Sequence, residues 1–253
     1  MNRKDTARRG ISRLAILLIV AAAAIFVGSV FFMMVWATRE VHQAARISAS
    51  KSGLRQIGLA LHTYAGDHRD LFPGDVMSDS GKSLLSWRVA ILPYIEQTEL
   101  YEAFKLDEPW DSPHNKRLLA EMPAIYASPL SQVDLASDHK TVYLRPTGSG
   151  LAMDSHKSVG LEMPDGTSNT VIAVEANDSH AVPWTKPDDL PYDPKTPLAG
   201  LVGQLGDGFL ALFADVSVLK MSTGIAPKAW HAMLTRSGRE RIDRTRWEAK
   251  KKL

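Results

Sequence analysis

The longest apolar run lies near the N-terminus, from Leu14 to Trp36, and contains no charged residue. A helix over this run would span roughly 34 Å, enough to cross a bilayer core of about 30 Å. The apolar part of a cleaved signal peptide is shorter, about 7–15 residues. The run therefore predicts a retained transmembrane helix over residues 14–36, with a cleaved signal or a buried soluble helix as the alternatives.

Charges on either side of this run predict its orientation. Arg39 and Glu40 cancel after it, whereas the segment before it is basic. The charged residues before the run are Arg3, Lys4, Asp5, Arg8, Arg9 and Arg13. Because cytoplasmic flanks carry the excess of lysine and arginine, we expect residues 1–13 in the cytoplasm and a periplasmic or other extracytoplasmic domain after a single pass.

The helical pattern continues beyond the apolar run. No proline occurs over 39–64, and an apolar stripe recurs at helical spacing at Leu54, Ile57, Leu61 and Tyr64. Gly53 and Gly58 indicate close packing or a bend, because glycine is unfavourable inside a helix. Gly66 is the predicted C-terminal cap.

The remaining pattern predicts short helices followed by strands. We expect helices over 87–92, over 99–104, from Pro113 to before Pro123, and from Pro227 to before Gly238. We expect strands over 140–147, 168–176, 208–214 and 216–221. This order predicts an α+β fold, with a long N-terminal transmembrane, pilin-like helix followed by short helices and an antiparallel β-sheet. Residues 37–235 would form the exported domain, and 236–253 a basic tail.

Composition and motifs give little support for catalysis. The chain of 253 residues has a net charge of +2 and no cysteine, which excludes thiolate zinc sites and cysteine nucleophiles. Its eight histidines form no metalloprotease motif, and no nucleophile elbow, phosphate loop or dinucleotide fingerprint occurs. We therefore predict no enzyme activity, no catalytic residue and no cofactor. A ligand- or carbohydrate-binding module and an unrecognised hydrolase are the alternatives.

One acidic segment is a candidate metal site. Asp188, Asp189 and Asp193 lie in the proline-rich sequence KPDDLPYD, and carboxylate oxygens are the ligands that calcium prefers. Lys186 and Lys195 flank the three aspartates. The alternative is therefore a solvated cluster of charges with no bound ion.

Tryptophans and the basic tail offer two further candidate surfaces. Trp87, Trp110 and Trp184 are predicted to anchor loops to the core, with a carbohydrate or peptide platform as the alternative. The tail from Arg236 holds eight basic and three acidic residues. It is predicted to be a solvated terminus, with contact to lipid headgroups, anionic polymers or DNA as alternatives. Only Trp247 is available for stacking on bases, so no specific nucleic-acid partner is predicted.

Six segments, taken in order, resemble one family. They are GLRQIGLALHTYAGDHRDLFPGD (53–75), LSWRVAILPYIEQTELYEAF (85–104), LDEPWDSPHNKRLLAEMPAIYASP (106–129), DGTSNTVIAVEA (165–176), AVPWTKPDDLPYD (181–193) and GFLALFADVSV (208–218). Together they resemble the planctomycete domain-of-unknown-function 1559 family, over about 45–236. The resemblance implies a pilin- or pseudopilin-like cell-envelope protein with a prepilin-type N-terminus and no established activity. The implied partners are the lipid bilayer, further copies of the chain and secretion- or pilus-type assembly components.

The sequence departs from the family pattern in three places. Gly10 falls at the expected prepilin cleavage position, but Ala15 replaces the glutamate of the motif, so a plain anchor becomes the stronger interpretation. Ser50 and Ser128 occupy positions where relatives often carry cysteine, which implies that the two thiols form a disulfide in relatives. Where relatives carry a histidine and then Asp-Gly, this chain has Gln204 and Asp215–Val216. Since valine resists the positive φ of a type I′ turn, we expect a different turn over 214–217.

Overall fold

The computed structural model describes residues 13–153, 159–160, 163–236, 238 and 243–249. It divides into two compact units, Met1–Arg46 and Ile47–Leu253. Residues 1–12 of the predicted cytoplasmic segment, including the candidate cleavage position Gly10, lie outside the described residues.

The predicted long N-terminal helix is confirmed as α1 (Arg13–Asp67), which continues without a break from the apolar run into the second unit. The other α-helices are α2 (Trp87–Ala90), α3 (Thr98–Ala103) and α4 (Pro227–Leu234). Short 3₁₀ helices are η1 (Leu92–Ile95), η2 (Asn115–Glu121), η3 (Ala124–Tyr126), η4 (Asp178–His180) and η5 (Arg244–Trp247).

A four-stranded sheet forms the centre of the second unit. Its strands are β5 (Tyr143–Leu144), β8 (Val171–Glu175), β11 (Gly208–Phe213) and β12 (Val218–Ser222). Their order is β12-β11-β8-β5, and every neighbouring pair is antiparallel, which confirms the predicted α+β class. Two-stranded pairings add β1 (Leu71–Phe72), β2 (Val76–Met77), β3 (Ser83–Leu85), β4 (Lys140–Thr141), β6 (Pro146–Thr147), β7 (Val159–Gly160), β9 (Val182–Pro183) and β10 (Leu190–Pro191).

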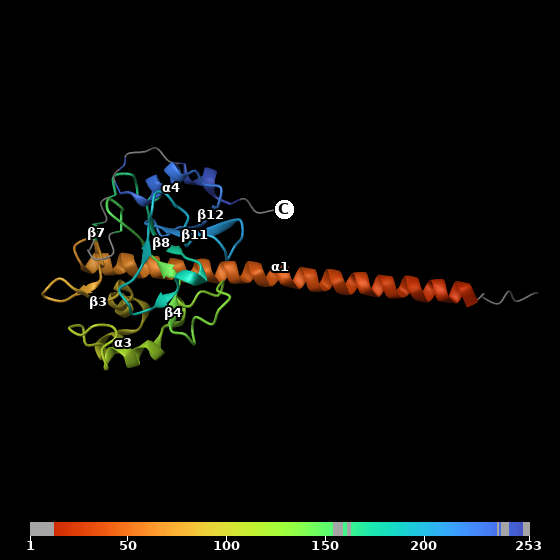
Figure 1. Cartoon of the computed structure of the whole chain (residues 1–253), viewed down its shortest axis with the longest axis horizontal. Coiled ribbons are helices and arrows are strands. Elements are labelled where there is room, and N and C mark those ends of the chain that lie inside the picture. Colours follow the sequence, from red (N-terminus) through yellow and green to blue (C-terminus); the bar gives the residue numbers. More distant parts are fainter. Residues whose placement is uncertain (1–12, 154–158, 161–162, 237, 239–242, 250–253) are drawn as a thin grey trace, which may run out of the picture. The chain divides into compact units, whose positions relative to one another are not determined.

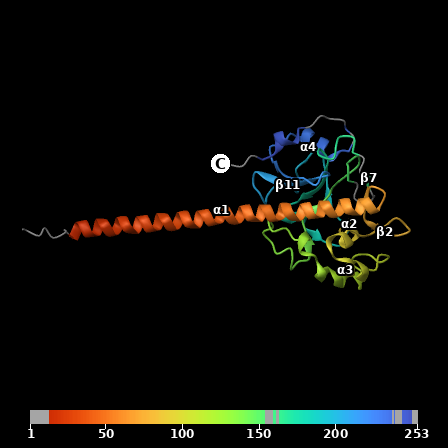
Figure 2. The same cartoon turned by 180° about the vertical axis from the view of Figure 1, so that it is seen from behind.

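Strand β11 explains why the core has two layers. Its side chains alternate between the two faces of the sheet, as a period of two requires. Leu210 and Leu212 belong to the cluster that includes Leu54 and Ile57 of α1. Phe209, Ala211 and Phe213 belong to the cluster that includes Trp230 and Met233 of α4. In Figures 1 and 2, α4 and α3 accordingly lie on opposite sides of the segment of α1 within this unit.

Three local predictions were wrong in detail. The segment after Pro113 forms the 3₁₀ helix η2 rather than an α-helix. The expected strand 140–147 is divided into β4, β5 and β6, because each piece pairs with a different strand, β9, β8 and β10. Gly66 is not a left-handed cap, since positive φ values occur at Arg69 and Asp70 instead.

The turn between β11 and β12 differs from type I′, as predicted. Among residues 214–217 only Val216 has a positive φ, 66°. The amide of Val216 donates to the carbonyl of Phe213 at 2.9 Å, and the amide of Phe213 donates to the carbonyl of Ser217 at 2.9 Å. Valine therefore does occupy the left-handed region, at a cost typical of β-branched residues there.

Gly58 allows α1 to approach the sheet closely. A Cβ placed there would lie 3.0 Å from Cδ1 of Leu212 and 3.2 Å from Cγ1 of Val216.

We therefore expect Gly58→Leu to lower the free energy of unfolding by about 1–3 kcal/mol, the usual cost of overpacking. Gly66→Ala is the control, because nothing lies within 4 Å of that position. It should raise stability by about 0.5–1 kcal/mol through helix propensity. Urea unfolding of both variants in detergent measures the difference, and equal midpoints would contradict close packing at Gly58.

Candidate functional site

The apolar part of α1 in the first unit is exposed at residues 17–18, 21–34 and 36, where the structure describes the side chains. Ile25, Phe32 and Trp36 expose 73%, 71% and 61% of their surface. This is the one helix among the described residues that is long and apolar enough to cross a membrane, and none of its most apolar window is buried. The exposure argues against a buried soluble helix, since such a helix would cover its apolar face. A membrane anchor and a cleaved signal are the interpretations that fit this exposure.

A buried ionic network lies beneath the motif that contains Trp87. The guanidinium of Arg88, which is fully buried, pairs with Asp189 at 2.7 Å and donates to the carbonyl of Tyr143 at 2.9 Å. Trp87 donates from Nε1 to Oδ2 of Asp189 at 3.1 Å. The amide of Arg145 donates to Oδ1 of the same carboxylate at 3.0 Å. The network thus joins α2, β5 and the loop before β10.

Arg145 contributes a second buried guanidinium to this network. It stacks 4.2 Å from the centre of the Trp87 ring. Within the described residues, none of its three guanidinium nitrogens has a hydrogen-bond partner. Burial lowers the pKa of Arg145 to about 10, although the nearby carboxylates of Asp189 and Asp75 act to raise it. The network therefore contains two buried guanidiniums, one paired with Asp189 and one without a hydrogen-bond partner among the described residues.

The three candidate calcium ligands are separated by their partners. Asp189 points into the buried network, whereas Asp188 pairs with Lys186 at 2.8 Å on the surface. Asp193 accepts from the amide of Lys195 at 2.8 Å. Over the part of the chain that the structure describes, no group of three or more histidine, cysteine, aspartate or glutamate side chains is placed to hold a metal ion.

The tryptophan prediction is confirmed for two of the three residues. Trp87 and Trp184 are fully buried. Trp184 stacks on Tyr126 at 5.7 Å and donates to the carbonyl of Leu119 at 3.1 Å. Trp110 is partly buried against the same core. Buried rings cannot serve as a surface platform, so the platform interpretation does not apply to Trp87 or Trp184.

The structure brings Ser50 and Ser128 to one buried carboxylate. Ser50 donates to Oε2 of Glu175 at 2.8 Å, and Ser128 donates to Oε1. The hydroxyls of Ser50 and Tyr143 are also 2.9 Å apart. These hydrogen bonds tie α1 to β8, β5 and the loop after η3. In this chain, hydrogen bonds to Glu175 therefore connect Ser50 and Ser128. These are the two positions at which the family resemblance implies a disulfide in relatives.

This proximity predicts a disulfide in an engineered variant. We expect Ser50→Cys with Ser128→Cys to form an intramolecular bridge on mild oxidation, because both side chains reach the same carboxylate. In the chain-entropy account, a bridge closing a loop of this length adds about 4 kcal/mol. Thiol labelling after oxidation measures bridge formation, with each single cysteine variant as control. Two thiols that stay reactive in the double variant would contradict the expected proximity.

Part of the basic tail packs on the domain. Arg244 pairs with Asp215 at 3.0 Å and stacks 4.9 Å from the ring centre of Phe213. The amide of Ala249 donates to the carbonyl of Lys220 at 2.7 Å, which places this segment beside β12. Residues 243–249 of the tail are therefore not a freely solvated terminus. Residues 237, 239–242 and 250–253 lie outside the described residues.

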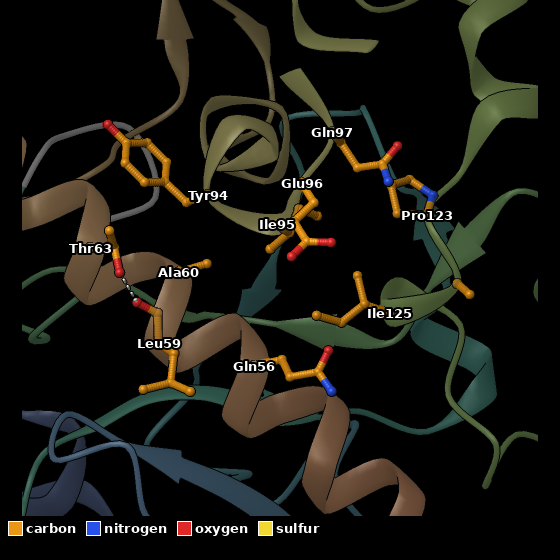
Figure 3. Close-up of a pocket in the computed structure, with 11 residues that line it drawn as sticks. Gln56, Leu59, Ala60, Thr63, Tyr94, Ile95, Glu96, Gln97, Pro123 and Ile125 are labelled. Atoms are coloured by element: carbon orange, nitrogen blue, oxygen red, sulfur yellow. Dashed lines mark hydrogen bonds between the residues drawn. The ribbon is translucent and has the colours of Figure 1, made fainter. Parts of the chain in front are cut away.

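A surface hollow of about 420 Å³ lies in the second unit, beside the C-terminal part of α1. Helix α1 contributes Gln56, Leu59 and Thr63 to its lining. The end of η1 and the two residues after it contribute 94–97, and the third wall is 123–125. Figure 3 shows these side chains around the opening. Sequence reasoning missed this hollow, because its three walls come from segments that only the fold brings together.

The fold and its sites define an α+β domain that continues from an exposed apolar helical stem. Residues 39–163 match the model of a family described as a protein of unknown function, DUF1559. The match confirms the resemblance over this segment. Neither the curated proteins nor the solved structures contain a match to the chain.

Proposed function

We propose that the protein is a membrane-anchored, pilin- or pseudopilin-like protein of the cell envelope that acts by assembly or interaction, without catalysis. The observation that carries this proposal is the apolar run of α1, which is long enough to cross a bilayer and is exposed. Water does not favour such a surface over several helical turns, whereas lipid does.

The charge pattern supports an orientation for this anchor. The basic residues before Leu14 would stay in the cytoplasm, and residues 37–253 would lie in the periplasm or another extracytoplasmic compartment. The lipid bilayer is then the first partner. Further copies of the chain or secretion- and pilus-type components are the proposed protein partners, and we propose no specific nucleic acid and no cofactor.

The intact mass of the protein extracted from native membranes tests this proposal. The expected species retains residues 14–36, whether or not cleavage after Gly10 has occurred. A mass that corresponds to a chain beginning beyond Trp36 would show a cleaved signal and overturn the anchor. A species that begins at residue 11 and carries an N-terminal methyl group would support the pilin-like form of the proposal.

A ligand-binding role is the second candidate, favoured by the hollow beside α1. Its lining combines amide, carboxylate and apolar side chains, a mixture typical of binding sites. The two roles are compatible, because an assembly protein also needs a surface that recognises its partner.

A further inference from the structure

The hollow beside α1 presents three polar side chains that have no partner in the part of the chain that the structure describes. Gln56, Glu96 and Gln97 all line it. None of these three side chains forms a hydrogen bond or ion pair within the described residues. Figure 3 shows the Glu96 carboxylate, on the residue that follows η1, and the Gln56 carboxamide, from α1. Unpaired polar groups at a surface are free to bind a ligand without first losing an internal bond.

The described lining residues include one with an ionisable acidic side chain, Glu96, and none with a basic side chain. The hydroxyl of Tyr94 is already used, since it donates to Asp67 at 3.1 Å. Glu96 ends η1 with a φ of 62°, in the left-handed region. An anion would meet this carboxylate with no cation to compensate it, so the hollow favours a positively charged group.

Apolar side chains lie next to that carboxylate. Leu59 exposes 54% of its surface, and Ile95 and Ile125 line the same hollow. Lysine and arginine combine a long aliphatic stem with a cationic head, so they can cover apolar surface while the head makes an ion pair. Amide oxygens of the two glutamines can accept further hydrogen bonds from the same head.

From this chemistry we infer that the hollow receives a lysine or arginine side chain of a partner protein. The inference rests on the proposed interaction role and names the chemistry of the partner. A partner protein fits better than a free amine, because Gln56, Leu59, Glu96 and Ala124 are all exposed at the opening. Small ligands are usually held in clefts that bury most of their surface. An open hollow instead fits one anchoring side chain of a larger interface.

Two isoleucine methyl groups provide a direct probe of occupancy. Full-length protein in detergent micelles, labelled with ¹³C at isoleucine methyls, is titrated with the N-acetylated, C-amidated tetrapeptide Ala-Ala-Lys-Ala and then with the arginine equivalent, so that the side chain carries the peptide's only cation. We expect saturable shifts of the Ile95 and Ile125 methyl signals. Tetrapeptides with norleucine or glutamate in place of lysine should leave these signals unchanged, because they lack the cation.

Glu96→Gln tests the ion pair, and Glu99→Gln is its matched control, because Glu99 is exposed nearby but does not line the hollow. We expect Glu96→Gln to weaken peptide binding by about fivefold, as loss of an exposed ion pair would, and Glu99→Gln to leave it unchanged. Unchanged signals from isoleucines elsewhere would show that both variants are folded.

Other results would overturn the inference. Equal binding of the norleucine peptide would show an apolar hollow without charge selection. Equal weakening by both glutamate variants would show nonspecific attraction, and no shift with either cationic peptide would show that the hollow binds neither side chain. Shifts that depend on protein concentration alone would assign the hollow to a second copy of the chain. Each of these outcomes leaves the anchor proposal standing, because membrane retention is measured separately.

Discussion

A chain with aspartate at both Val27 and Val30 is expected to lose its stable attachment to membranes. Both residues lie in the exposed apolar part of α1. One aspartate at the centre of a transmembrane helix costs about 2.5–3.5 kcal/mol on insertion scales, so two cost roughly 5–7 kcal/mol. The measurement is the fraction of protein that stays with membranes after an alkaline carbonate wash.

Aspartate at Val41 and Ala44 is the matched control for this experiment. These residues have the same spacing and are exposed on the same helix, but they lie beyond the predicted span. Aspartate outside the bilayer has little effect on orientation, so the control should remain in the membrane fraction. If the variant with aspartate at Val27 and Val30 stays with the membranes in the same fraction as the control, residues 14–36 are not the membrane-spanning segment.

Arg88→Met is expected to cause a large loss of folding stability. Methionine preserves much of the side-chain volume but leaves Asp189 without its buried cation, 2.7 Å away in the native protein. Removing one member of a buried ion pair costs about 3–5 kcal/mol. Urea unfolding of the full chain in detergent, followed by tryptophan fluorescence, measures this loss because Trp87 lies in the same network.

Two further variants separate burial of charge from pairing of charge. Lys186→Met breaks the ion pair between Lys186 and Asp188, in which both side chains are about two-fifths exposed. It should lower the free energy of unfolding by less than about 1 kcal/mol. Arg145→Met removes a buried guanidinium without a hydrogen-bond partner among the described residues, so it should cost less than Arg88→Met. Equal losses from Arg88→Met and Lys186→Met would contradict the assigned role of the Arg88–Asp189 pair.

Elements with a strong periodic pattern could be predicted from the sequence. The uncharged run and the stripe that follows it predicted α1, and the continuous apolar sequence of β11 predicted a buried strand. The segment 140–147 has a good strand composition but was not predicted as three pieces. Its pairing is set by three strands distant in sequence, which local propensity does not report. Gly66 carried a cap signal, but tertiary packing places the left-handed residues beyond it, at Arg69 and Asp70.

The sites were less predictable than the elements. Asp188 and Asp189 are neighbours in sequence, yet one lies at the surface with Lys186 and the other is buried with Arg88. An aspartate pair carries no signal that distinguishes these environments. The hollow depends on an amide of α1, a carboxylate after η1 and the segment before η3, so only the folded chain identifies it. Ser50 and Ser128 were singled out by the family resemblance, but Glu175, which joins them, was not.

The most direct test of the account is the side of the membrane on which each end of the chain lies. The protein has no cysteine, so a single introduced thiol can be labelled without background. Thr6→Cys marks the N-terminal segment, and Lys228→Cys marks the exposed surface of α4. In spheroplasts treated with a membrane-impermeant thiol reagent, the account predicts labelling at position 228 and labelling at position 6 only after permeabilisation. Labelling at position 6 before permeabilisation, or protection of position 228, would contradict an anchor that carries the folded unit out of the cytoplasm.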